Sequence, residues 1–179
     1  YTGDDCTMRI PNWEIQTLFK KEVMRYLTGI GSDAKMLKRL LSSLLTGKAA
    51  DFEAELSGFL CAMASFYDTG AKESFYHGLV LGLLATLMPR FEVVSNREAG
   101  YGRFDIAIFP GKNQTAGALL EFKVAESEGE MTIRAKEALA QIEKNAYTAE
   151  FERRGVSDVW QYGIAFCGKK CHIERKVQE

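Results

Sequence analysis

The sequence predicts an α/β fold in which helices surround a mixed β-sheet, preceded by a helical N-terminal segment. Apolar residues recur at helical spacing before Pro89, whereas short β-branched or alternating runs separated by turns follow it. A helical stretch separates the third of these runs from the fourth, and a crossover of this kind joins parallel strands. We therefore expect a helical segment over residues 1–68 and an α/β core over residues 69–179.

Four helices are expected ahead of the sheet, because apolar side chains there recur every three or four residues. Gly29, Gly31 and Gly47 separate the first three helices, and Pro89 stops the fourth. Their apolar faces are predicted over residues 15–27, 36–45, 51–63 and 72–88.

The sheet is predicted from three closely connected strands and a fourth beyond a helix. Short polar, glycine-containing turns join the first three, which favours an antiparallel meander. Gly155 ends the following helix, and the last strand should lie parallel to the third. The strands are predicted over residues 91–97, 104–109, 119–124 and 159–167, and the helix over residues 132–154.

The composition is that of an ordinary globular protein, with 46% hydrophobic and 26% charged residues. The formal net charge of −1 gives no global basic field for a nucleic-acid partner, although a bound cation can supply local positive charge. The longest apolar stretch, residues 78–88, is too short to cross a bilayer, so no membrane association is expected.

The cysteines favour reduced thiols in a cytoplasmic setting. Cys61 lies in an apolar helical run and is expected to be a small buried residue. Cys167, Cys171 and His172 lie close together, but the sequence lacks the second ligand pair that a structural zinc site needs.

Three charged residues interrupt the predicted apolar strands. Asp105 lies within the run FDIAIF, and Glu121 and Lys123 lie within LLEFKV. Side chains alternate along a strand, so Glu121 and Lys123 point to the same face, and Asp105 can reach them from the neighbouring strand. Buried carboxylates are costly unless they are paired or bind metal. The residues alone leave two interpretations open, a site for a divalent cation and a structural ion pair of Lys123.

The arrangement of Asp105 followed by Glu121-Phe122-Lys123 resembles the D…(E/Q)xK signature of the PD-(D/E)XK nuclease superfamily. Phe104 occupies the position where that pattern often has proline. The predicted order of helix, three-strand meander, helix and strand also resembles the restriction-endonuclease-like core of that superfamily.

Longer stretches resemble one group of proteins within it. The runs SNREAGYGRFDIAIFP, LLEFKV and AKEALAQIEKNAY are similar to the nuclease-like C-terminal domain of bacterial AAA-ATPase-like proteins, and RIPNWEIQTLF is similar to the linker after their ATPase region. The resemblance implies that Tyr1 begins the C-terminal part of a larger protein with an ATPase-like N-terminal domain. The sequence contains no P-loop, so ATP binding is not expected of this chain.

The resemblance also implies roles for further residues. Glu73 would join Asp105 and Glu121 as a ligand to magnesium or manganese, and Gln141 would face the same site. On position alone, Glu73 is a solvated residue in a first helical turn and Gln141 one polar position on an amphipathic helix. His77 is expected to be a hydrogen-bonding neighbour of the site. Tyr147 and Arg103 are weaker candidates.

The function that follows is metal-dependent hydrolysis of phosphodiester bonds, in DNA, with Asp105, Glu121, Lys123 and Gln141 as catalytic residues. The alternative is a domain of the same fold that binds nucleic acid or protein without cleaving. The near-neutral net charge favours this alternative over a fast nonspecific nuclease.

Overall fold

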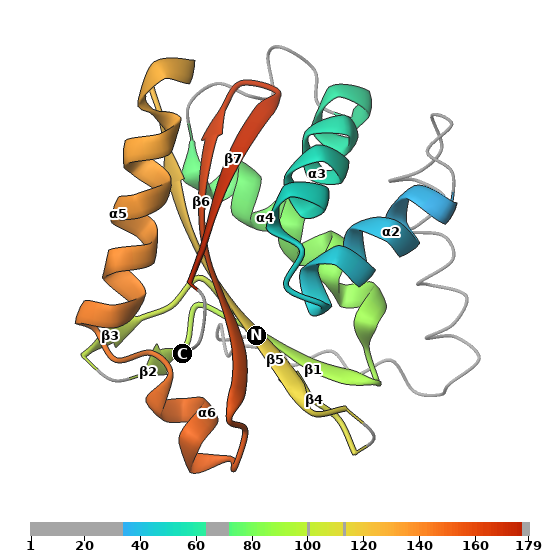
Figure 1. Ribbon diagram of the computed structural model, residues 1–179, viewed down its shortest axis with the longest axis vertical. Helices are drawn as coiled ribbons and strands as arrows, with labels where there is room; N and C mark the ends of the chain where they lie inside the picture. The colour runs from blue at the N-terminus through green and yellow to red at the C-terminus, as the bar shows by residue number, and fades with distance from the viewer. Residues whose placement is uncertain (1–33, 64–71, 100, 113, 177–179) are drawn as a thin grey trace, which may run out of the picture.

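The computed structural model describes residues 34–63, 72–99, 101–112 and 114–176, and Figure 1 shows helices on both sides of a twisted sheet. The helix predicted over residues 15–27 and the segment RIPNWEIQTLF lie outside the described residues. The helices are α2 (Ala34–Leu45), α3 (Ala49–Met63), α4 (Glu73–Leu84), α5 (Met131–Lys144) and α6 (Ala149–Arg153), with 3-10 turns η1 (Ala85–Leu87) and η2 (Glu128–Glu130). The strands are β1 (Phe91–Ser95), β2 (Glu98–Ala99), β3 (Gly102–Arg103), β4 (Ile106–Pro110), β5 (Ala116–Val124), β6 (Asp158–Cys167) and β7 (Lys170–Lys176).

The main sheet of the described residues has five strands in the order β1-β4-β5-β6-β7. Strands β1, β4 and β5 form an antiparallel meander, and β6 pairs parallel with β5 after the crossover through α5 and α6. Both features confirm the predicted mixed sheet. A separate two-strand hairpin, β2–β3, lies between β1 and β4 along the chain.

Each face of the sheet has its own apolar core. Alternate residues of β5 separate the two cores, since Leu120 and Phe122 pack with α2, α3 and α4, whereas Leu119 packs with α5 and α6. Helices α2 and α3 thus share one core with the sheet, through residues such as Leu44 and Leu56. The division of the chain at residue 68 stays a prediction.

Four details differ from the expectations. The helix predicted over 132–154 breaks between α5 and α6, where Ala146 takes a left-handed φ of 50°. The predicted turn 98–103 contains the β2–β3 ladder. Strand β7 was not predicted, because its run KCHIERK offers only Cys171 and Ile173 as buried apolar positions. Finally, β4 begins at Ile106, so Asp105 precedes the strand instead of lying within it.

The prediction for Cys61 is wrong. Its side chain is exposed on α3, and its thiol contacts the Lys169 carbonyl oxygen at 3.6 Å. Cys171, in contrast, is buried beside Ser57. No helix among the described residues is long and apolar enough to cross a membrane.

Candidate active site

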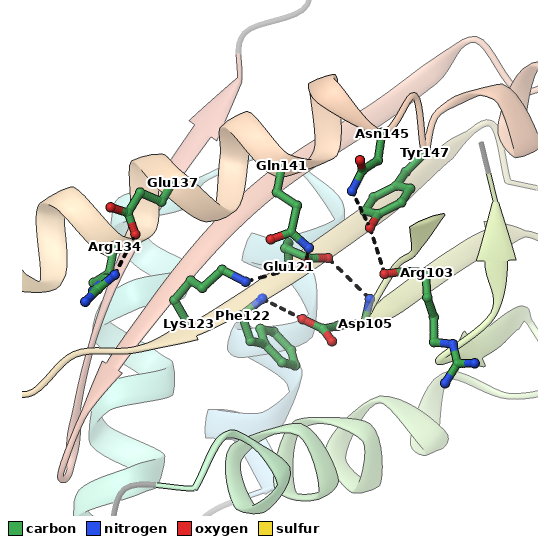
Figure 2. A network of polar contacts seen from close by, with 10 residues as sticks. All are labelled: Arg103, Asp105, Glu121, Phe122, Lys123, Arg134, Glu137, Gln141, Asn145 and Tyr147. Atoms are coloured by element: carbon green, nitrogen blue, oxygen red, sulfur yellow. Dashed lines mark hydrogen bonds and ion pairs between the residues drawn. The ribbon is translucent and has the colours of Figure 1, made fainter. Parts of the chain in front are cut away.

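The two central carboxylates lie where the pairing between β4 and β5 ends. The ladder begins at Ile106 and Leu120, so one residue further out Asp105 lies beside Glu121. The two strands are joined there by side chains. The Asp105 N–H donates to Glu121 Oε2 at 3.4 Å, and the Phe122 N–H donates to Asp105 Oδ2 at 2.7 Å (Figure 2). The carboxylates therefore satisfy backbone donors that the ladder no longer reaches.

Lys123 lies two residues beyond Glu121 on β5 and approaches the same carboxylate. Its Nζ is 3.9 Å from Glu121 Oε1, and its side chain is 28% exposed whereas that of Glu121 is 3% exposed. This distance is at the outer limit of an ion pair, and much longer than a charge-assisted hydrogen bond. Lys123 is therefore near Glu121 without a direct hydrogen bond to it.

Gln141 reaches Glu121 from helix α5, which packs on the sheet. Its side-chain Nε2 donates to Glu121 Oε1 from α5, as Figure 2 shows. Gly163 on β6, the register partner of Glu121, makes this approach feasible. A Cβ atom at Gly163 would lie 2.1 Å from the Ala135 carbonyl oxygen and 2.6 Å from the Leu139 nitrogen. The missing side chain thus lets the α5 backbone lie directly on the sheet beside Glu121.

Glu73 and His77 lie at the start of α4, which packs on the face of the sheet opposite to α5. Glu73 is the first residue of α4 and is exposed, and its charge interacts with those of Asp105 and Lys123. His77, one turn later, places Nε2 3.2 Å from the Asp105 carbonyl oxygen and 3.0 Å from Ser95 Oγ. His77 therefore contacts the backbone of the Asp105 segment.

The two weaker candidates have different surroundings. Tyr147 is buried, and its hydroxyl donates to the Arg103 carbonyl oxygen at 2.8 Å while accepting a bond from Asn145 Nδ2. It anchors the chain leading to Asp105. The Arg103 side chain is exposed and extends away from this network (Figure 2). Neither side chain meets the carboxylates.

The electrostatics of the site come from carboxylates held close together in a poorly solvated place. Burial and then the charge of Asp105 raise the pKa of Glu121 to about 8, against the opposing effect of Lys123. Burial also raises the pKa of Asp105, although the Phe122 N–H, His77 and Lys123 act in the opposite direction. Partial burial and the charge of Asp105 raise the pKa of Glu73. Such a cluster favours any cation that can replace the protons.

The donor set suits a hard divalent cation. Carboxylate oxygens are ligands that magnesium and manganese prefer, and Asp105 and Glu121 supply them side by side. Within the described ranges, no three His, Cys, Asp or Glu side chains form a ready-made cage. Magnesium typically uses one or two carboxylates and completes its shell with water and substrate phosphate. The pair Asp105 and Glu121 fits that mode of binding.

The raised pKa of Glu121 predicts a stability that depends on pH. Between about 4.5, the ordinary value, and about 8, the unfolded chain loses the proton that the folded chain keeps. The free energy of unfolding should therefore fall as pH rises through this window, by at most about 1.4 kcal/mol per pH unit for this one group. Urea unfolding in EDTA should show that decline for wild type and a flatter profile for Glu121→Gln. The exposed Glu152→Gln serves as control, and equal profiles for all three proteins would refute the assignment.

Sequence reasoning did not single out three residues that shape the site. Ser95 and Asn145 are ordinary polar residues at element ends and carry no recognisable signal. Gly163 did carry one, because an isolated glycine inside an apolar strand often marks a close backbone approach. The roles assigned to Glu73, Asp105, Glu121, Lys123 and Gln141 stay predictions. The structure joins the last four by hydrogen bonds and an ion pair, whereas Glu73 is related to them only through its charge.

Comparison with known proteins places the chain in a family. The comparison with curated proteins finds no match. A family model described as the PD-(D/E)XK nuclease superfamily matches residues 71–176, which is more than half of the 179 residues and includes every site residue discussed above. The mixed sheet and flanking helices of this chain are consistent with the restriction-endonuclease-like fold of that superfamily. Nucleases of the superfamily typically use divalent metals. The chain belongs to the PD-(D/E)XK nuclease superfamily.

Proposed function

We propose that this chain is a metal-dependent nuclease domain that hydrolyses phosphodiester bonds in DNA. The observation that carries the proposal is the pair Asp105 and Glu121, whose carboxylates lie side by side with raised pKa values and with a loosely held ammonium group, Lys123, beside them. A structural ion pair would be expected to bring Lys123 into a direct hydrogen bond. The 3.9 Å separation leaves the ammonium group able to serve a substrate.

In this proposal Asp105 and Glu121 hold magnesium or manganese, and Glu73 contributes a further carboxylate from α4. When bound, such a cation supplies Lewis-acid polarisation of the phosphate and activation of water. The hydrogen bond from Gln141 fixes the rotamer of Glu121, so its carboxylate is already oriented before substrate arrives. From α4, His77 contacts the Asp105 carbonyl oxygen, and Ser95 on β1 in turn contacts the His77 ring.

Lys123 has a separate role in the proposal. Its ammonium group is partly exposed and stands on the face of β5 that carries Glu121. From there it orients the attacking water or stabilises the negative charge that develops on the phosphate oxygens. A fixed charge of this kind is worth most when negative charge is forming, so its main effect is on the transition state.

The wider context is part of the same proposal. The resemblance of SNREAGYGRFDIAIFP and the following runs to domains of bacterial AAA-ATPase-like proteins supports an ATPase-like N-terminal domain in a longer protein. A cytoplasmic setting agrees with the free thiols of Cys61, Cys167 and Cys171.

A cleavage assay with matched substrates tests the proposed function. The chain is incubated with supercoiled plasmid, single-stranded DNA and RNA of matched sequence, each with magnesium, manganese or EDTA. We expect scission of DNA with either metal and none in EDTA. Cleavage of RNA alone would refute the assignment of DNA. No cleavage of any substrate with either metal would favour the alternative, a domain that binds without cutting.

A further inference from the structure

A short hairpin projects beside the candidate active site. Strands β2 (Glu98–Ala99) and β3 (Gly102–Arg103) form it, and Arg103 is only two residues ahead of Asp105. Asn96 starts the projection, because its left-handed φ of 52° turns the chain out of β1. Whatever the hairpin binds is therefore brought next to the carboxylates.

The tip of this hairpin carries an aromatic side chain in open solvent. Tyr101 is 88% exposed, compared with 61% for Ile133 and 45% for Met88, the other large exposed apolar side chains of the described residues. Aromatic side chains bury large areas when they can, so such an exposure is unusual for a tyrosine in a folded domain. A single exposed ring at a projecting tip is suited to stacking on a flat partner.

The exposure of Tyr101 does not come from a loose backbone. The Tyr101 N–H donates to the Asn145 carbonyl oxygen at 2.9 Å, and the Phe104 N–H donates to the Arg97 carbonyl oxygen at 3.3 Å. Tyr147 and Asn145 hold the other strand through the Arg103 carbonyl oxygen (Figure 2). The break between α5 and α6 supplies both of these anchoring residues. The hairpin is thus fixed against the core with its tyrosine directed outward.

Two arginines flank the ring. Arg97 and Arg103 are exposed, and no ion pair joins either guanidinium to another described residue. Glu98 is opposite Arg103 in the hairpin register, yet no ion pair forms between them. Elsewhere on the described surface, arginines such as Arg153 and Arg154 are paired with carboxylates. The hairpin therefore offers cationic groups that remain available to an external anion.

We propose that the β2–β3 hairpin binds the unpaired part of a nucleic-acid strand, with Tyr101 stacked on a base and Arg97 and Arg103 on the flanking phosphates. This inference rests on the proposed function and specifies its substrate as DNA with single-stranded character near the cut. Stacking platforms combined with cationic side chains are how proteins hold single strands, since every unpaired base has a free face. A continuous duplex hides those faces, so it gives Tyr101 nothing to stack on.

Binding without cleavage tests the inference separately from the nuclease activity. Fluorescence anisotropy in EDTA measures the affinity for a labelled thymidine oligonucleotide of about 16 nucleotides and for a blunt duplex. Tyr101→Ala should weaken binding to the single strand about tenfold and leave duplex binding unchanged, whereas Tyr101→Phe should bind both like wild type. Ile133→Ala is the control for loss of an exposed apolar side chain. These positions are exposed, so the variants should remain folded.

The arginines have their own readout. For a single strand, Arg103→Ala should lower the slope of log affinity against log salt by about 0.7, whereas the exposed Arg90→Ala, at the opposite end of β1, should leave it unchanged.

Wild-type binding to the single strand that is unaffected by Tyr101→Ala would overturn the inference even if the chain cuts DNA. Tyr101-dependent binding without any cleavage would instead uphold it and overturn the proposed catalysis. A wild type that binds no oligonucleotide would overturn it in favour of a protein partner.

Discussion

Replacing Lys123 by alanine should lower metal-dependent DNA cleavage by about a hundredfold or more while the chain stays folded and binds DNA nearly as well as wild type. In the proposed mechanism the ammonium group acts mainly on charge that forms in the transition state, so its loss should reduce turnover far more than affinity. One phosphate contact at most is lost from the bound state. The comparison requires single-turnover cleavage and equilibrium binding on the same preparation.

The structure makes this variant a clean test of catalysis. Lys123 Nζ is 3.9 Å from Glu121 Oε1, and the raised pKa of Glu121, about 8, keeps that buried carboxyl protonated near pH 7, so removing the partly exposed ammonium group leaves no buried charge unpaired. Its loss should cost less than about 1 kcal/mol of unfolding free energy. A buried pair would instead lose about 3–5 kcal/mol. Lys136→Ala, on the exposed face of α5, is the matched control. A folded Lys123→Ala protein that cuts as fast as Lys136→Ala would show that the ammonium group has no catalytic role.

The sequence predicted those parts of the fold and site that depend on local pattern. The alternation in LLEFKV is enough to place Glu121 and Lys123 on one face of β5, and the structure has them there. The short turns and the intervening helix were enough to predict an antiparallel meander followed by a parallel strand. These predictions hold because side-chain alternation and connection length determine them locally.

Other features depend on contacts between distant segments, and the pattern could not predict them. Asp105 lies just before β4, outside the ladder. Its side-chain carboxylate, and not its backbone carbonyl, accepts the hydrogen bond from the Phe122 N–H. The break after α5 arises where Asn145 and Tyr147 turn to hold the hairpin. The distance between α5 and the sheet depends on Gly163, forty-two residues from Glu121 in sequence and its neighbour in the sheet.

Asp105→Asn should strongly weaken metal binding and at the same time stabilise the chain in EDTA. The asparagine oxygen can still accept the Phe122 N–H, so the local fold should be kept. Removing the charge of Asp105 also removes one of the causes that raise the pKa of Glu121 to about 8, so less energy is needed to ionise it. A residue retained for structure alone would show the opposite, a loss of stability with no effect on metal.

The same substitution should weaken manganese binding by about a hundredfold or more, since losing a direct ligand should cost at least as much as losing a supporting residue. In wild type at about pH 7, Glu121 must give up its proton when the cation binds, so binding should release close to one proton per ion. The pH dependence of manganese affinity reports this release.

A calorimetric manganese titration of wild type and Asp105→Asn, with each thermal midpoint in EDTA recorded beside it, tests the central claim that these carboxylates form a metal site. We expect a saturable site with proton release in wild type, and strongly weakened binding in an Asp105→Asn protein that melts at a higher temperature. Equal manganese binding by the two proteins would contradict the claim.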